Sequence, residues 1–390
     1  MLIKISGIKR SAFARNVAVL VGGRGMALLV AFLLTPVVAS LFSPADFGVA
    51  AVFVAISQLL STVSALGYQN AVVLPKSDIK AGQLLVLSKV LLAGFVLLLF
   101  AYLGGMELTG AEPPFSNTLG SWVWIVPIVV GILGARHIRE AVLTRSKEFM
   151  VSARAGIGNV VSMSISRIRL GLLFGSSVWG LVSGYILGGL VNLLMLRGRT
   201  AVHHDVMTAK VGWGQLKRLA KEYQDFPLLN APSALMVGMS AKLPLLFFGL
   251  WLGPAVVGLY AMATRLITTP ITTTANALRR VYLQKAADME RKNQNLAEVF
   301  WKVTLALFAS GFVPFGLLWL YGEEILGFVL GETWREAGLY SEIMAPWFFL
   351  LWTSAVVSPT MVVRRKQGVF TALQFIMFIC RVAVLGWCYT

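Results

Sequence analysis

The chain has 390 residues, of which 57% are hydrophobic and 13% are charged, and its mean hydropathy is +0.77. Soluble domains are about 45–50% apolar and about 25% charged, so this composition excludes an ordinary soluble enzyme. A formal net charge of +17 would suggest a nucleic-acid partner for a soluble protein, but here it indicates basic loops on one side of a membrane, and we expect no nucleic acid.

Apolar runs of about 20 residues recur along the whole chain, and each can cross a hydrocarbon core of about 30 Å. We therefore predict an all-α polytopic membrane protein with about eleven transmembrane helices. The span over 151–173 is the least apolar, because it carries serines and arginines. The predicted spans are 17–41, 47–70, 83–104, 119–141, 151–173, 177–197, 226–250, 255–278, 299–320, 341–362 and 368–388.

The basic residues of the predicted loops define an orientation. With a cytoplasmic N-terminus, the inside segments hold 26 Lys and Arg residues and the outside loops hold one, Arg335. Short cytoplasmic loops accumulate Lys and Arg, so we predict a multi-pass protein of the inner membrane with its N-terminus in the cytoplasm. The inside segments are 1–16, 71–82, 136–154, 197–222, 279–302 and 364–366.

An internal repeat is visible at an offset of 210 residues. LFSPADFGVAAV (41–52) aligns with WLGPAVVGLYAM (251–262), which places Pro44 on Pro254 and Gly48 on Gly258. Both stretches form the outside turn between the first two helices of a half. Proline opens a helix, and small residues let two helices approach closely, so both turns have the same physical requirements.

This repeat predicts two pseudo-symmetric lobes of six-helix type, related by an axis along the membrane normal and arranged around a central cavity. The N-terminal lobe covers 1–197, and a cytoplasmic inter-lobe loop covers 198–224. The C-terminal lobe covers 225–390 and contains five predicted helices, so either a twelfth helix is absent or two spans are merged.

Cations and carboxylates are distributed differently along the spans. All 17 carboxylates lie in loops or near span ends, whereas seven cations fall inside. A central Arg or Lys costs roughly 2.5–3.5 kcal/mol on insertion scales. Snorkelling toward the headgroups could offset this cost for Lys89 and Arg24, and helix carbonyls could hold one or two arginines. The alternative is a hydrated cationic cavity that receives an anion. The seven cations are Arg24, Lys89, Arg167, Arg169, Lys242, Arg265 and Arg381.

The candidate site residues follow from this asymmetry. Arg265 lies near mid-span, directly before the polar segment TTPITTTAN (268–276). In SRIRLGLLFG (166–175), Arg167 and Arg169 are two positions apart and point about 200° away from each other on a helix, so at most one can face a cavity. The predicted cavity cations are Arg265, Arg167, Arg169, Lys242, Arg381 and Arg24, and the predicted polar residues are Thr268, Thr272, Asn276, Asn230 and Asn159.

Several other functions lack support in the sequence. It contains no P-loop lysine motif, no cluster of metal ligands and no nucleophile–base pair, so we expect no cofactor, no metal and no enzyme activity. Cys380 and Cys388, eight positions apart on one predicted helix, indicate neither a disulfide framework nor a metal site.

Two stretches carry a resemblance to a known family. LFSPADFGVAAV resembles the turn between the first two helices of bacterial polysaccharide-export (O-antigen, Wzx-like) flippases of the multidrug/oligosaccharidyl-lipid/polysaccharide exporter superfamily, with Ser43, Pro44, Asp46, Phe47 and Gly48 filling the pattern. GETWREA (331–337) is similar to the outside segment that follows the ninth helix in the family. These positions look structural and are not carried over as substrate contacts.

The resemblance implies a fold and a function. Family members have two six-helix lobes around a cavity that faces alternately inward and outward, and usually twelve or fourteen spans. They move undecaprenyl-pyrophosphate-linked oligosaccharide from the inner to the outer leaflet for the synthesis of surface polysaccharide. The implied partners are this lipid-linked substrate, membrane lipids and a polysaccharide polymerase or export machinery. Two alternatives stay open: a multidrug or organic-cation antiporter of the same superfamily, and a non-transport scaffold of an export complex.

Overall fold

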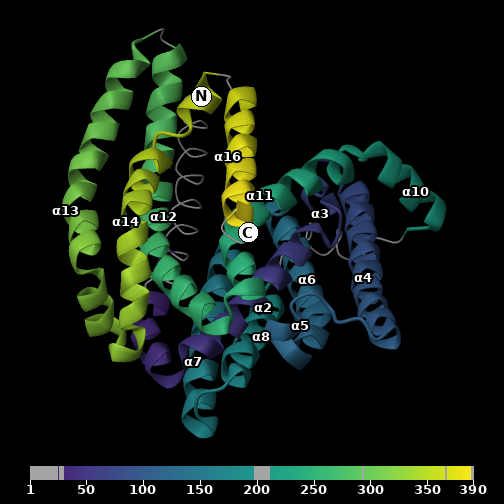
Figure 1. Ribbon diagram of the computed structural model, residues 1–390. Coiled ribbons are helices and arrows are strands. Elements are labelled where there is room, and N and C mark those ends of the chain that lie inside the picture. The colour runs from purple at the N-terminus through teal and green to yellow at the C-terminus, as the bar shows by residue number, and fades with distance from the viewer. Residues whose placement is uncertain (1–24, 26–29, 197–210, 292–293, 365–366, 388–390) are drawn as a thin grey trace. The chain divides into compact units, whose positions relative to one another are not determined.

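A computed structural model describes residue 25 and residues 30–196, 211–291, 294–364 and 367–387. The described part is helical and contains no strand (Figure 1). It divides into two compact units: unit 1 comprises Met1–Leu34 and Val49–Pro254, and unit 2 comprises Thr35–Gly48 and Ala255–Thr390.

Unit 1 holds the long helices of the first half of the chain and the three elements that follow them up to Trp251. Its elements are α2 (Pro44–Val63, which begins in unit 2), α3 (Tyr68–Ala71), α4 (Asp78–Leu108), α5 (Ser116–Leu119), η1 (Gly120–Ile125), α6 (Val126–Arg145), α7 (Phe149–Phe174), α8 (Val178–Met195), α10 (Trp213–Glu222), η2 (Phe226–Asn230) and α11 (Ala231–Trp251).

Unit 2 holds the helices of the last part of the chain and the segment that precedes α2. Its elements are α12 (Pro254–Arg291), α13 (Leu296–Leu330), η3 (Glu332–Trp334), α14 (Arg335–Ala355), α15 (Thr360–Val363) and α16 (Gln367–Trp387).

The predicted spans correspond to helices wherever the structure describes them. Eight helices of the described part are long and apolar enough to cross a membrane, and two shorter apolar helices cover Val30–Leu41 and Ala372–Trp387. The prediction of an all-α polytopic membrane protein is confirmed. Helix α14, with 21 residues, occupies most of the predicted span 341–362.

Some predicted boundaries were wrong. The second span does not continue to residue 70, because α2 ends at Val63 and the backbone turns at Leu66 and Gly67, both with positive φ. The predicted inside loops 136–154 and 279–302 are largely helical, since α6 runs to Arg145 and α12 runs to Arg291. Charged residues at the end of an apolar run hide this continuation, because a helix keeps its backbone geometry after its hydropathy falls.

Helices α7 and α8 form a tightly packed pair. Their contact follows small residues of α8 at four-residue spacing, as in other close helix pairs of membranes. A Cβ atom on Gly184 would lie 2.5 Å from the Cγ atom of Arg167, and one on Gly188 would lie 2.8 Å from the Oδ1 atom of Asn159. One turn further along α8, the side-chain amide of Asn192 donates to the carbonyl of Ala155 at 2.8 Å.

An arginine fixes the loop between α3 and α4. The Arg145 guanidinium, at the end of α6, donates to the Asp78 carboxylate through Nε at 2.9 Å and Nη2 at 2.7 Å. Its Nη1 atom donates to the carbonyls of Val72 at 3.1 Å and Pro75 at 2.7 Å. Because Arg145 is only 10% exposed in its side chain, this network orders the end of unit 1 at which α3, α4 and α6 meet.

The two stretches that resemble the exporter family meet in unit 2. Ser43 and Asp46 form a reciprocal cap at the start of α2: the Asp46 N–H donates to Ser43 Oγ at 3.2 Å, and the Ser43 N–H donates to Asp46 Oδ2 at 3.3 Å. The ring of Phe47 stands edge-on to the fully buried indole of Trp334, with centroids 5.1 Å apart. The Trp334 indole N–H donates to the carbonyl of Ala39 at 2.9 Å.

The two turns of the predicted repeat also touch each other. A Cβ atom on Gly258 would lie 1.8 Å from the carbonyl oxygen of Pro44 and 3.0 Å from the backbone nitrogen of Gly48. Contact between equivalent positions is expected where a pseudo-two-fold axis passes between two repeats. Helix α11, which the sequence analysis placed in the C-terminal lobe, belongs to unit 1. The lobe boundaries 1–197 and 225–390 stay a prediction.

Helices α13 and α14 pack side by side in unit 2 (Figure 1). Helix α13 is kinked at Tyr321, whose φ of −137° is not helical. The Glu342 carboxylate of α14 accepts from the backbone N–H of Glu323 at 3.0 Å, directly after the kink. A carboxylate close to the membrane therefore has a structural role here, because it pairs an N–H group that the kink frees from the helix ladder.

Candidate functional site

Arg167 lies inside the α7–α8 pair rather than facing lipid. Its side chain is buried, with 7% of its surface exposed. Its Nε atom donates to the carbonyl of Leu181 at 3.2 Å, and its aliphatic stem lies over Gly184, where a larger residue would not fit. The missing side chain of Gly184 therefore makes the space for an arginine at this depth.

Arg169 lies on the opposite side of α7 and is exposed. The structure thus separates the two arginines as helix geometry requires: one contacts the neighbouring helix, and the other points away from it. The sequence alone does not distinguish which of the two arginines is buried, because both have apolar neighbours in the chain.

Helix α6 brings further cations into the span. Arg136 and Arg139 were assigned to an inside loop, but they lie nine and six residues before the helix end at Arg145, or about 14 Å and 9 Å along the axis. The Arg139 guanidinium donates to the carbonyl of Leu193 in α8. Arg136 lies 3.6 Å from the Glu140 carboxylate, one turn along the same helix.

These residues form a polar cluster within unit 1, which we call cluster A: Gln58, Arg136, Arg167 and Tyr185. The charges of Arg136 and Arg167 both act on the hydroxyl of Tyr185 in α8. The Gln58 amide of α2 donates to that hydroxyl at 3.5 Å, the long limit of a hydrogen bond. Cluster A therefore draws one residue from each of four helices, α2, α6, α7 and α8, and its side-chain hydrogen bond joins Gln58 to Tyr185.

Unit 2 carries a second polar segment on α12. Arg265 has an exposed side chain and belongs to a helix kinked by Pro270. The proline removes the N–H group that would pair with the carbonyl four residues earlier. The threonine hydroxyls of this segment donate to carbonyls of their own helix: Thr268 to Thr264 at 2.6 Å, and Thr272 to Thr268 at 2.8 Å. Thr268 and Thr272 therefore support the helix around the kink and keep their lone pairs available as acceptors.

Arg381 of α16 is half-buried, and its charge acts on the hydroxyl of Tyr260 in α12. We use the name cluster B for five polar residues of two unit 2 helices, α12 and α16: Tyr260, Arg265, Thr268, Thr272 and Arg381. Both units thus contain a tyrosine hydroxyl inside a span within electrostatic range of an arginine. Tyr185 and Tyr260 were not predicted as site residues, because a tyrosine in an apolar helix is expected to pack in the hydrophobic core.

The other predicted residues are dispersed. Lys242 is half-buried on α11, and Asn159 is half-buried against Gly188. Asn230 is exposed at the end of η2 and accepts from the Asn70 amide at 3.1 Å, so it joins η2 to α3. Asn276 lies in α12, but its side chain falls outside the described structure, as does Arg24.

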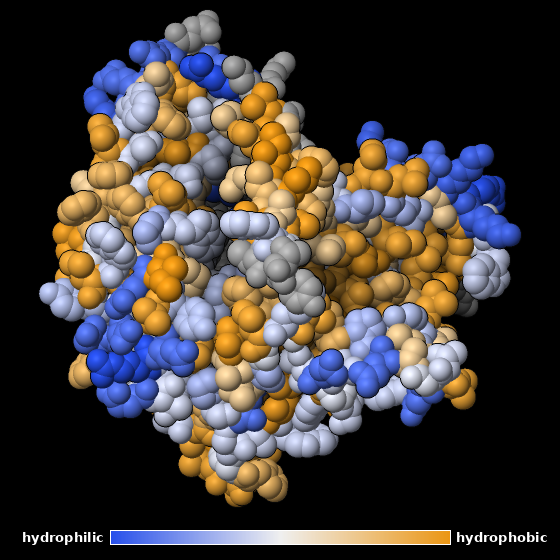
Figure 2. All heavy atoms as spheres, in the orientation of Figure 1, coloured by the Kyte–Doolittle hydropathy of each residue, from blue (hydrophilic) through white to orange (hydrophobic). Residues whose placement is uncertain are grey.

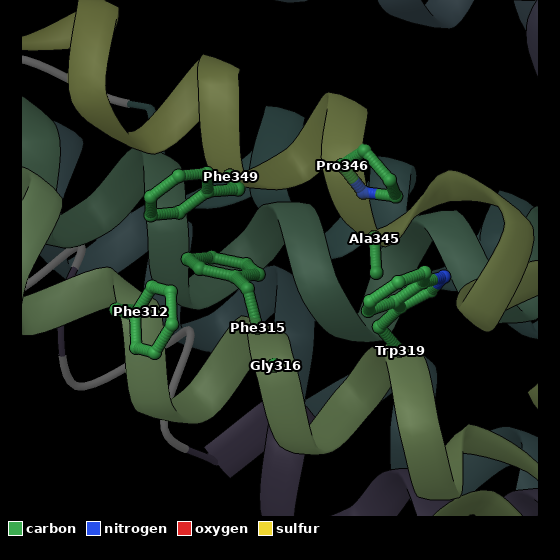
Figure 3. A pocket seen from close by; sticks show the side chains of 7 residues that line it. All are labelled: Phe312, Phe315, Gly316, Trp319, Ala345, Pro346 and Phe349. Atoms are coloured by element: carbon green, nitrogen blue, oxygen red, sulfur yellow. The ribbon is translucent and has the colours of Figure 1, made fainter.

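A groove between α13 and α14 has the wrong chemistry for an anion. It encloses about 180 Å³ and is lined by Phe312, Phe315, Gly316, Trp319, Ala345, Pro346 and Phe349. Figure 3 shows the rings of Phe315 and Phe349 facing each other across it. No charged side chain lines the groove, so it cannot neutralise a phosphate.

The family model described as "Polysaccharide biosynthesis protein" matches residues 37–338, which include most of the described helices. The chain belongs to this family. The resemblance drawn from Ser43–Gly48 and Trp334 is therefore confirmed, and both stretches prove to be structural contacts of unit 2.

Two individual proteins are similar to this chain. The succinoglycan biosynthesis transport protein ExoT of Rhizobium meliloti (strain 1021) is 23% identical over 317 residues, which are 78% of this chain and 60% of the relative. A solved inward-facing structure of a multidrug resistance MATE family transporter of the MOP superfamily is 15% identical and aligns with a TM-score of 0.50, covering 88% of this chain and 82% of that chain. The second likeness shows the fold.

Proposed function

We propose that this protein is a flippase for surface polysaccharide synthesis. It moves undecaprenyl-pyrophosphate-linked oligosaccharide from the inner to the outer leaflet by alternating access. It lies in the inner membrane with its N-terminus in the cytoplasm. The family match supports a role in polysaccharide biosynthesis. The curated relative is named as a transport protein, and the chain spans 60% of its length.

We infer the substrate class from the cations that lie inside the spans. Cluster A contributes Arg136 and Arg167, and cluster B contributes Arg265 and Arg381. A pyrophosphate entering hydrocarbon meets a large desolvation penalty unless it is paired. Arginine suits this role because its planar guanidinium binds phosphate oxygens in pairs and stays charged.

An organic-cation antiporter is the alternative within the same superfamily. Its cargo would require a deep carboxylate, since a positive charge in the bilayer is as costly as a negative one. In the part of the chain that the structure describes, Glu140 lies next to Arg136, and Glu342 of α14 accepts a backbone N–H group of α13. Within the described spans the cations outnumber these carboxylates, so the chemistry favours an anionic cargo.

Complementation tests this proposal. In a strain that lacks the native copy, Arg265→Lys should retain part of the export of lipid-linked oligosaccharide, because the positive charge is kept. Arg265→Gln should lose it, because the charge is removed while the side chain stays long. The measurement is the amount of lipid-linked oligosaccharide that reaches the outer leaflet, at equal protein levels.

The matched control is Lys302→Gln, which removes a cation paired with Glu298 at 2.6 Å near the start of α13 and should export normally. If Arg265→Gln and Arg136→Gln both export like the parent chain, the cations have only structural roles. The cationic-cavity mechanism would then be wrong.

A further inference from the structure

We propose that α10 is a docking surface for anionic phospholipid headgroups at the membrane face where α4 begins. This surface lies outside the polar clusters of the spans and does not depend on the nature of the transported cargo. The basic face consists of Gly214, Lys217, Arg218 and Lys221, all of which are exposed. They recur at three- and four-residue spacing, so they share one face of the helix.

The opposite face holds α10 firmly in unit 1. Leu216 and Leu219 are 6% and 5% exposed and belong to a buried cluster that includes Leu84 and Leu85 of α4. The helix is therefore amphipathic, but its leucines are buried in protein. The face of α10 that is accessible to the membrane is therefore the basic face and not the apolar one.

Polar contacts lock the same position. The Tyr68 hydroxyl donates to the carbonyl of Ala220 at 2.9 Å, and burial raises the pKa of the Tyr68 phenol, so it stays protonated as the donor. Lys80 of α4 pairs with Glu222 at 2.6 Å and lies over the ring of Tyr223. These bonds hold α10 against the first turns of α4, so its basic face points away from the rest of unit 1.

The depth of α10 follows from what it touches. Helix α4 is 31 residues long, or about 46 Å, which exceeds a hydrocarbon core of about 30 Å. Its first turn carries the charged residues Asp78 and Lys80, which places this end at the interface. Figure 2 shows hydrophilic residues gathered over the α10 region beside a hydrophobic flank. Trp213, at the start of α10, is 73% exposed, and exposed tryptophans are typical of the headgroup level.

Charge complementarity identifies the occupant. Three cations next to an exposed indole match the negative surface of a leaflet that contains anionic lipid, where each Lys or Arg gains roughly fivefold in affinity. A zwitterionic headgroup offers no net charge, so it gives no such gain. On the proposed orientation this leaflet is the cytoplasmic one.

Fluorescence quenching by brominated lipids tests this contact in the full chain. A bimane label on Gly214→Cys reports from the N-terminal end of the basic face, with Cys380→Ser and Cys388→Ser removing the native thiols. In nanodiscs, brominated phosphatidylglycerol should quench this label at least about threefold more than brominated phosphatidylcholine at the same mole fraction. High salt should bring the ratio toward one, because it screens exposed charges.

The triple variant Lys217→Gln, Arg218→Gln, Lys221→Gln should also bring the ratio to one. The matched control, Arg279→Gln, Lys285→Gln, Lys302→Gln, removes three charges from α12 and α13 and should leave the ratio unchanged. Equal quenching by the two lipids in the parent chain would overturn the proposal, and so would a preference that survives both the triple variant and high salt. Because the salt titration uses the parent chain, it decides even if the triple variant folds poorly.

Discussion

At the residue scale, helix geometry separated Arg167 from Arg169 before any contact was known, since two positions correspond to about 200°. The choice between them depended on α8. Gly184 leaves room for the stem of Arg167, and the carbonyl of Leu181 accepts its Nε–H group at 3.2 Å. Such a pocket depends on a second helix and cannot be read from the sequence around the arginine.

This difference predicts unequal effects of the two alanine substitutions on stability. Arg167→Ala should destabilise the protein by about 1–3 kcal/mol, because a buried side chain and its hydrogen bond are lost. Arg169→Ala should stay within about 0.5 kcal/mol of the parent, because that side chain is exposed. Thermal unfolding of the purified protein in detergent compares them. Equal midpoints for the two variants would contradict the packing described for α7 and α8.

At the element scale, the length of the apolar runs predicted the helices correctly, but charged residues near the helix ends led to predicted ends that come too early. Arg136 and Arg139 read as loop residues, although α6 continues to Arg145, because their cost is offset by partners on α8 and on α6 itself. The stretch around Ser43 and Asp46 was readable as a turn signal, but the contact of Phe47 with Trp334 was not, since the two rings are 287 positions apart in the chain.

Close approach of helices predicts which glycines are required. Gly188→Leu should destabilise the α7–α8 pair by more than about 1–3 kcal/mol, because the new side chain would overlap Asn159 and Met163. The control is Gly156→Leu on α7, where no atom lies within 4 Å of the added Cβ. Unfolding midpoints in detergent check the pair. If both variants unfold at the same temperature, the contact between α7 and α8 is not as close as described.

The contact between the two repeated turns predicts a similar sensitivity in unit 2. Gly258→Ala should reduce transport and stability, because its Cβ would collide with the Pro44 carbonyl. Gly316→Ala on α13 places its Cβ in open space and should behave like the parent chain. Transport at equal protein levels distinguishes them, and a fully active Gly258→Ala variant would show that the turns are free to separate.

At the scale of the whole molecule, loop charge predicts the topology. Glu112 and Glu290 are both exposed, and the orientation argument places them outside and inside the cell, respectively. With Cys380 and Cys388 replaced by serine, an impermeant maleimide should label Glu112→Cys in intact cells and Glu290→Cys only after permeabilisation. The reverse labelling pattern would show that the protein has the opposite orientation, and it would contradict the prediction that 26 Lys and Arg residues lie on the cytoplasmic side.

The central claim is that the chain moves a pyrophosphate-linked oligosaccharide across a bilayer by means of cations in its spans. Reconstitution of the purified chain in liposomes tests it most directly, by measuring how much lipid-linked oligosaccharide becomes accessible to an externally added glycosidase. We predict that the accessible fraction rises well above that of protein-free vesicles, and that Arg265→Ala slows the exchange at least about tenfold, as expected when a charge partner is removed. Accessibility equal to that of protein-free vesicles would contradict the account.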